Sequence, residues 1–163
     1  MIYTAIIVDD ELDAREGLAL LLQQDEDVKL VASCDNGLNA ISAIDEHSPD
    51  ILFLDVQMPQ VNGFDVLRSL QVVPRAVVFV TAYDDFALKA FEVQALDYLL
   101  KPFSDSRFFK ALNHAKEVVA NNRPERKNLV ESLLLKEDTS TELLEKQLDD
   151  RFVVKENGKI HIL

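Results

Sequence analysis

Polar residues stand at or directly after the ends of four short apolar runs, and together they could do phosphoryl chemistry. In chain order they are Asp9 with Asp10, Asp55, Thr81 and Lys101. Carboxylate oxygens bind hard cations such as Mg²⁺. A carboxylate can also attack phosphorus while a cation, a hydroxyl and an ammonium neutralise the phosphoryl oxygens. The set predicts a divalent-cation site beside a phosphoryl-accepting carboxylate, with Asp55 as the acceptor.

These residues can meet only if the apolar runs before them are parallel strands of one sheet. In an open parallel α/β sheet the C-terminal strand ends share one edge, and ligands bind outside that edge. The runs are almost continuously apolar, which is typical of strands covered on both faces. We expect strands over residues 2–8, 28–34, 51–54, 76–80 and 97–100.

Helical patterns separate the expected strands. A stripe of leucines follows the first strand, with Asp13 as the expected cap, and a second helix should stop at Ser48-Pro49. Three more helices are expected over residues 64–70, 86–92 and 104–122, the last with Phe108, Leu112, Ala115 and Val119 on one face. Five such units predict an α/β, flavodoxin-like doubly wound sheet of order 2-1-3-4-5. In that order the first and third strands are neighbours, so their aspartates meet.

The cation expected at this edge is Mg²⁺, with Mn²⁺ as an alternative. Asp10 and Asp55 are the expected direct ligands, and Asp9 is expected to bind through a metal-bound water. The backbone carbonyl of Gln57, two residues past Asp55, could complete the protein ligands. Three neighbouring carboxylates repel one another, and a cation would relieve that repulsion.

The phosphoryl group needs further positive and polar groups. Lys101 is expected to neutralise one phosphoryl oxygen, and the Thr81 hydroxyl with the backbone N–H of Ala82 another. Ala82 is small, which leaves room for the group. A cis peptide bond is expected between Lys101 and Pro102, because proline makes that geometry accessible.

Composition argues against nucleic-acid binding by residues 1–122 and against a membrane protein. The 163 residues carry a net charge of −12, and residues 1–122 alone hold 9 Lys/Arg against 20 Asp/Glu. Nucleic-acid binding needs a basic surface, which this part of the chain does not offer. The single cysteine, Cys34, fits a reducing cytoplasm, and no apolar run approaches the length of a membrane span. We therefore expect a cytoplasmic protein without membrane contact.

The sequence changes character after residue 122. Residues 123–150 are polar with scattered leucines, which indicates a partly helical linker. Residues 151–163 read as a β-hairpin around Asn157-Gly158, a strong signal for a tight turn. We therefore divide the chain into a domain over residues 1–122, the linker, and the opening hairpin of an incomplete second domain.

The first part resembles the receiver domain of bacterial two-component response regulators. The matching segments are IVDDE at 7–11, LDVQMP at 54–59, NG at 62–63, VTAY at 80–83 and DYLLKPF at 97–103. The resemblance implies a CheY-like fold and a cognate histidine kinase whose phosphohistidine transfers its phosphoryl group to Asp55. It implies that Thr81 and Tyr98 form a switch pair, and that Gln57 and Tyr83 tune the lifetime of the phosphoryl group.

The segment YDDFALKAFEVQAL at 83–96 resembles the receivers attached to LytTR DNA-binding domains, and residues 152–163 resemble the opening strands of that domain. The chain is therefore expected to be a truncated transcriptional regulator that reaches DNA only through the missing C-terminal domain. Phosphorylation is expected to produce a homodimer through a face formed by the fourth helix, fifth strand and fifth helix. The expected dimer-face residues are Phe86, Lys89, Phe91, Val93, Asp97 and Arg107.

Two other functions fit parts of the pattern. An Mg²⁺-dependent phosphohydrolase with an aspartyl nucleophile would use the same acidic cluster, but no second carboxylate stands after Asp55 as a general acid. A receiver-like interaction module that is never phosphorylated would not need the full set of site residues. Taken singly, Asp9-Asp10-Glu11 reads as a helix N-terminus and Lys101 as a solvated charge; their common place at strand ends favours a site.

Overall fold

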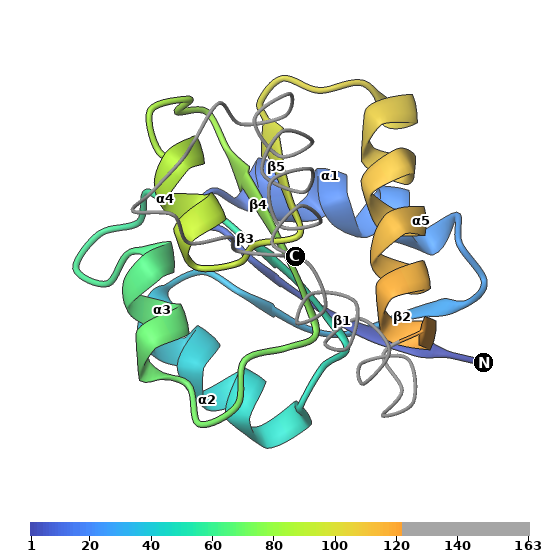
Figure 1. Cartoon of the computed structure of the whole chain (residues 1–163), viewed down its shortest axis with the longest axis horizontal. Helices are drawn as coiled ribbons and strands as arrows, with labels where there is room; N and C mark the ends of the chain where they lie inside the picture. Colours follow the sequence, from blue (N-terminus) through green and yellow to red (C-terminus); the bar gives the residue numbers. More distant parts are fainter. Residues whose placement is uncertain (122–163) are drawn as a thin grey trace, which may run out of the picture.

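The structure is a computed structural model, and it describes residues 1–121. Strands and helices alternate along the chain (Figure 1). The strands are β1 (Tyr3–Val8), β2 (Val28–Cys34), β3 (Ile51–Leu54), β4 (Ala76–Thr81) and β5 (Asp97–Leu100). The helices are α1 (Leu12–Gln23), α2 (Gly37–His47), α3 (Gly63–Ser69), α4 (Ala87–Glu92) and α5 (Asp105–Asn121).

The five strands form one parallel sheet in the order β2-β1-β3-β4-β5, which confirms the predicted topology. The chain moves outward from β1 to the β2 edge, crosses back to β3 in the centre and then continues to the β5 edge. The reversal lies between β1 and β3, where Val8 pairs with Leu54. The residues that follow these two strands are thereby placed side by side.

Alternating strand residues supply two cores, one on each face of the sheet. Ile7, Phe53 and Val78 pack beneath α1 and α5, and Ile6, Leu52 and Phe79 pack beneath α2, α3 and α4. Figure 1 shows the two groups of helices on opposite sides of the sheet. The four residues predicted for the buried face of α5 all lie in the core: Phe108, Leu112, Ala115 and Val119.

Local signals set most helix boundaries. The Asn36 side chain accepts a hydrogen bond from the Asn39 backbone N–H and caps α2, and Ser48 ends that helix in a left-handed conformation. A capping box between Asn62 and Asp65 begins α3. The prediction that Asp13 caps α1 is wrong: the helix begins at Leu12, so Asp13 lies in its first turn, where a negative charge complements the helix dipole.

Predicted and observed boundaries differ elsewhere by one residue, as at β4, which includes Thr81 as its last residue. The Lys101–Pro102 peptide bond is cis, as predicted. Within residues 1–121 no helix is long and apolar enough to cross a membrane. The predicted linker and hairpin, residues 123–150 and 151–163, lie outside the described residues.

Candidate functional site

Backbone hydrogen bonds at the C-terminal edge of the sheet fix the positions of the candidate residues. The Asp55 N–H donates to the Val8 carbonyl at 2.9 Å, which ties the end of β3 to the end of β1. The Lys101 N–H donates to the Thr81 carbonyl at 2.8 Å, which ties β5 to β4. Four strands thus deliver their terminal side chains to one place, as the order of the sheet requires.

Three carboxylates from two of these strand ends form an acidic cluster. Carboxylate oxygens of Asp9, Asp10 and Asp55 all lie within 4.8 Å of one another. Asp9 and Asp55 are buried, with 1% and 5% of their surfaces exposed, whereas Asp10 is exposed. Hard oxygen ligands at this spacing, two of them on the floor of the site and one at its mouth, fit a Mg²⁺ ion that keeps several of its waters.

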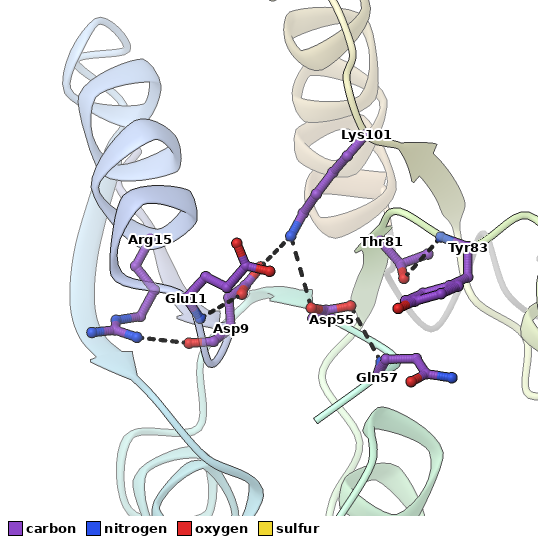
Figure 2. A network of polar contacts seen from close by, with 8 residues as sticks. All are labelled: Asp9, Glu11, Arg15, Asp55, Gln57, Thr81, Tyr83 and Lys101. Carbon is purple, nitrogen blue, oxygen red and sulfur yellow. Dashed lines mark hydrogen bonds and ion pairs between the residues drawn. The ribbon is translucent and has the colours of Figure 1, made fainter. Parts of the chain in front are cut away.

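Lys101 partly neutralises this cluster. Its Nζ lies 2.7 Å from Asp9 Oδ2 and 3.8 Å from Asp55 Oδ2 (Figure 2). Burial lowers the pKa of Lys101, but the hydrogen bond to Asp9 and the charge of Asp55 outweigh it and leave the pKa above its usual value. The ammonium therefore stays charged, between the two buried carboxylates.

The Asp55 carboxyl group ionises less readily than an ordinary aspartate. Burial and the neighbouring charge of Asp9 raise the pKa of Asp55 to about 6, although Lys101, the Thr81 hydroxyl and the Gln57 backbone N–H act in the opposite direction. The Gln57 N–H donates to Asp55 Oδ1 at 3.3 Å. At neutral pH the Asp55 carboxylate is thus mostly ionised, and the neighbouring groups offset its negative charge only in part. Binding of a cation or a phosphoryl group to this carboxylate is therefore favoured.

The loop after β4 forms the opposite wall. The Tyr83 backbone N–H donates to the Thr81 hydroxyl at 3.4 Å, and the Tyr98 hydroxyl donates to the Tyr83 carbonyl. Burial is the main cause that raises the pKa of Tyr98 to about 12, and the nearby carboxylates of Asp85 and Asp84 add to it. The Tyr98 hydroxyl therefore keeps its proton, and its hydrogen bond links β5 to this loop.

A hollow of about 370 Å³ opens above Asp55. It is wide enough for a phosphoryl group and waters, and the small, exposed side chain of Ala82 does not obstruct it. The hollow is lined by Asp10, Glu11, Asp55, Gln57, Met58, Pro59, Ala82, Tyr83 and Lys101. The structure thus brings together the predicted metal, phosphoryl and lifetime residues, with Asp9 and Thr81 buried beside them.

The predicted dimer-face residues are spread over α4, β5 and α5 with different exposures. Lys89 is exposed, and its Nζ lies 4.8 Å from the centre of the Phe64 ring. Arg107 binds the Asp97 carboxylate with both of its terminal nitrogens, at 3.1 and 2.7 Å. Phe86 and Val93 are partly buried. Phe91 is only 3% exposed, so the expectation that it lies on this surface is wrong: the side chain packs inward.

Two site features were missed by the sequence reasoning. The Arg15 guanidinium reaches back from α1 and donates to the Asp9 carbonyl at 2.8 Å. Gly63 lies so close to Asp55 that a Cβ there would be 2.5 Å from the Asp55 carbonyl oxygen. The available signals were an arginine one helical turn after Glu11 and a glycine after a helix-capping asparagine, and both are common for other reasons.

The chain matches the family model of the response regulator receiver domain over residues 5–113. This chain belongs to the response regulator receiver family. Among curated relatives, the transcriptional regulatory protein BtsR of Salmonella typhi is 45% identical over 113 residues, covering 69% of this chain and 47% of the relative. An uncharacterized response regulatory protein of Yersinia pestis is 46% identical over 121 residues, covering 72% of this chain and 50% of the relative. The chain thus spans about half the length of the curated relatives it matches.

Solved structures agree with the receiver assignment. The response regulatory domain of protein mrkE from Klebsiella pneumoniae has a TM-score of 0.67 and 32% identity, and the match covers 72% of this chain and 98% of that one. The signal receiver domain of the putative regulator NarL from Mycobacterium tuberculosis has a TM-score of 0.63 and 30% identity over 71% and 97% of the two chains.

The family settles the class of protein. This receiver has the CheY-like α/β fold, and its family is one of phosphoacceptors rather than classical enzymes, which argues against the phosphohydrolase alternative. The cluster of Asp9, Asp10 and Asp55 is typical of the Mg²⁺ site of receivers. A receiver also implies a cognate histidine kinase.

Proposed function

We propose that Asp55 accepts a phosphoryl group from the phosphohistidine of a cognate histidine kinase. The observation that carries the proposal is the buried Asp55 carboxylate at the floor of an open hollow, 3.8 Å from the Lys101 ammonium and clustered with Asp9 and Asp10. A buried, ionisable oxygen nucleophile with positive charge beside it suits phosphoryl transfer.

In the proposed transfer, an oxygen of the ionised Asp55 carboxylate attacks phosphorus from the floor of the hollow. The P–O bond forms as the P–N bond to the kinase histidine breaks, and the imidazole keeps that electron pair. The product is an acyl phosphate on Asp55. Its pKa of about 6 keeps the nucleophile mostly ionised above neutral pH. Lys101 stays protonated throughout and can shift from Asp9 to a phosphoryl oxygen.

The carboxylates of Asp10 and Asp55 and the backbone carbonyl of Gln57 would hold Mg²⁺, with Asp9 bound through a water. The ion supplies positive charge against the clustered carboxylates and the phosphoryl oxygens. The Thr81 hydroxyl and the Ala82 backbone N–H would contact a remaining oxygen, because Ala82 lines the hollow and Thr81 is buried directly beside it.

The output of the switch follows from the β4–α4 loop. Drawing Thr81 toward a phosphoryl group would move the Tyr83 backbone, and with it the bonded Tyr98 and α4. We propose that this repacks the dimer face, so that a two-fold dimer pairs two output domains on a repeated DNA site. The similarity to the transcriptional regulatory protein BtsR supports a transcriptional regulator. We propose that it is cytoplasmic and that its output domain is a LytTR domain, which the sequence predicts to begin at residues 151–163.

The test combines a small phosphodonor with an acceptor variant. The full chain is treated with Mg²⁺ and acetyl phosphate, or with beryllofluoride, beside Asp55→Asn, and intact mass and sedimentation are read together. We expect one Mg²⁺-dependent phosphoryl addition, lost in Asp55→Asn and accompanied by dimerisation. No addition would leave a receiver-like interaction module, and an addition that persists in Asp55→Asn would place the acceptor elsewhere.

A further inference from the structure

Every hydrogen-bonding group of Asp9 has a partner. Its N–H donates to the Cys34 carbonyl at 3.1 Å, and its Oδ1 accepts from the Glu11 N–H at 2.9 Å. Its Oδ2 accepts from Lys101, and its carbonyl oxygen accepts from Arg15 Nη1 at 2.8 Å (Figure 2). Asp9 is 1% exposed, so an unpaired group there would lack water as a substitute. Arg15 therefore satisfies a buried carbonyl that has no other partner among residues 1–121.

Within the described residues, the Arg15 guanidinium binds a carbonyl rather than a carboxylate. In the described part of the chain no carboxylate lies within ion-pairing distance of its guanidinium, and the Asp9 carbonyl is its acceptor. A charged donor bonded to a neutral carbonyl is stronger than an ordinary backbone hydrogen bond. The half-buried Arg15 side chain thus uses its charged, planar guanidinium to hold one peptide group at the start of the β1–α1 loop.

That peptide group is the one that carries Asp10. The carbonyl carbon and oxygen of Asp9 share a plane with the nitrogen and Cα of Asp10, and the plane resists twisting. Asp10 is exposed, and within residues 1–121 no hydrogen bond or ion pair holds its carboxylate. Its direction therefore depends on its backbone. Two side chains hold that backbone: Asp9 Oδ1 accepts from the Glu11 N–H, and Arg15 binds the carbonyl of the Asp9–Asp10 peptide.

We propose that Arg15 is a positioning residue for the metal ligand Asp10: by binding the Asp9 carbonyl it fixes the Asp9–Asp10 peptide plane and holds the Asp10 carboxylate in the acidic cluster. The proposal rests on the proposed function, because it assigns Asp10 to the Mg²⁺ site. Under this proposal Arg15 supports Mg²⁺ binding, although its side chain touches neither the ion nor the phosphoryl group.

The electrostatic effect of Arg15 has the opposite sign. A positive charge beside an acidic cluster repels Mg²⁺, so a purely electrostatic role predicts that removing the charge tightens Mg²⁺ binding. A positioning role predicts that removing the donor weakens it, because the free protein then samples orientations of Asp10 that do not bind. The direction of the change in Mg²⁺ affinity therefore separates the two roles.

The experiment measures the dissociation constant of Mg²⁺ by calorimetry on the full chain, together with the backbone amide shifts of Asp10 and Glu11 by NMR without Mg²⁺. Arg15→Met keeps the length of the side chain but removes the donor and the charge. Arg15→Lys keeps the charge and can still donate a hydrogen bond, but it lacks the planar guanidinium. Arg75→Met is the matched control, because Arg75 is exposed and precedes β4 at the opposite edge of the sheet.

We expect Arg15→Met to raise the Mg²⁺ dissociation constant about three- to tenfold and to shift both amides in the absence of Mg²⁺. Arg15→Lys should fall between Arg15→Met and the wild type, and Arg75→Met should match the wild type. An unchanged or lower dissociation constant in Arg15→Met overturns the proposal; if that variant does not fold, the same result in Arg15→Lys does so. A wild type that binds no Mg²⁺ and accepts no phosphoryl group would instead overturn the proposed function.

Discussion

Asp55 combines deep burial with an ionisable group, and its protonation should make stability depend on pH. The carboxylate is 5% exposed, and burial together with Asp9 raises its pKa from 3.8 to about 6. The folded state thus binds the proton more tightly than the unfolded state. This stabilising contribution is complete below pH 4 and is lost as the pH rises through 6. Above that range the ionised group opposes folding until a cation compensates it.

Replacing this carboxylate with an amide should therefore stabilise the protein in the absence of metal. We expect Asp55→Asn to raise the free energy of unfolding by about 1–3 kcal/mol at pH 7.5, and by less at pH 5. Urea denaturation in EDTA at both pH values measures the difference. Asp84→Asn, at an exposed position of the β4–α4 loop, serves as the control. Equal stability of Asp55→Asn and the wild type at pH 7.5 would contradict the assigned burial cost.

Tyr83 should set the lifetime of the phosphoryl group. Its side chain is 48% exposed and lines the hollow above Asp55, where it can restrict the approach of a hydrolytic water. We expect slow autodephosphorylation in the wild type and a half-life at least about threefold shorter in Tyr83→Ala, equivalent to roughly 0.7 kcal/mol of barrier. Decay of the phosphorylated mass with time measures it. Tyr83→Phe keeps the ring and should resemble the wild type, whereas a Tyr83→Ala half-life equal to that of the wild type would sink the idea.

At the scale of elements, the contact between β3 and α3 places the acceptor backbone. The Gly63 N–H donates to the Val56 carbonyl at 2.9 Å, and the helix approaches so closely that only a hydrogen fits at its first residue. The adjacent Phe64 then packs on Phe79 of β4, with ring centres 5.1 Å apart. The start of α3 is thus fixed against both the end of β3 and the neighbouring strand β4.

A methyl group at this contact should be costly. We expect Gly63→Ala to lower the free energy of unfolding by about 2–3 kcal/mol, because the obstacle 2.5 Å away is the Asp55 backbone rather than a flexible side chain. Gly17→Ala is the matched control: nothing lies within 4 Å of a Cβ there, and an alanine inside α1 should stabilise by about 0.5–1 kcal/mol. Chemical denaturation of both variants gives the comparison. An unchanged free energy of unfolding in Gly63→Ala would show that α3 can move away from the end of β3 without cost.

The sequence predicted the strands and their order well because continuous apolar runs report burial on both faces of a parallel sheet. It also predicted the meeting of Asp9, Asp10 and Asp55, since topology alone places them at one edge. Contacts made by long side chains could not be predicted in this way. The hydrogen bond from Arg15 to a carbonyl six residues earlier depends on the angle at which α1 leaves the loop.

Sequence reasoning also failed to distinguish the exposed residues of α4 from the buried ones. Apolar residues of α4 fit a dimer face and a core equally well, because a helix of six residues has fewer than two turns from which to read an amphipathic pattern. Phe91 proved to be buried while Leu88, three residues earlier, is 50% exposed. The sequence could indicate which elements form the predicted dimer face, but it could not tell which of their apolar residues are exposed.

At the scale of the whole molecule, net charge opposes self-association. Residues 1–122 carry 9 basic and 20 acidic residues, and an acyl phosphate adds further negative charge. A phosphorylation-dependent dimer must therefore gain its free energy from local complementarity on the dimer face. Lys89, a predicted residue of that face, is the exposed cation of α4, and its Nζ lies 4.8 Å from the centre of the Phe64 ring.

Reversing that charge should prevent dimerisation without affecting the acceptor. In a two-fold interface each substitution occurs twice, so we expect Lys89→Glu to weaken the phosphorylated dimer at least about tenfold. Loss of the contact with Phe64 should cost no more than about 1 kcal/mol of stability. Lys29→Glu, on the exposed part of the β2 edge strand, makes the same change of charge away from the face. Sedimentation equilibrium after beryllofluoride treatment decides: a Lys89→Glu dimer as tight as that of Lys29→Glu would mean that the protein associates through a different surface.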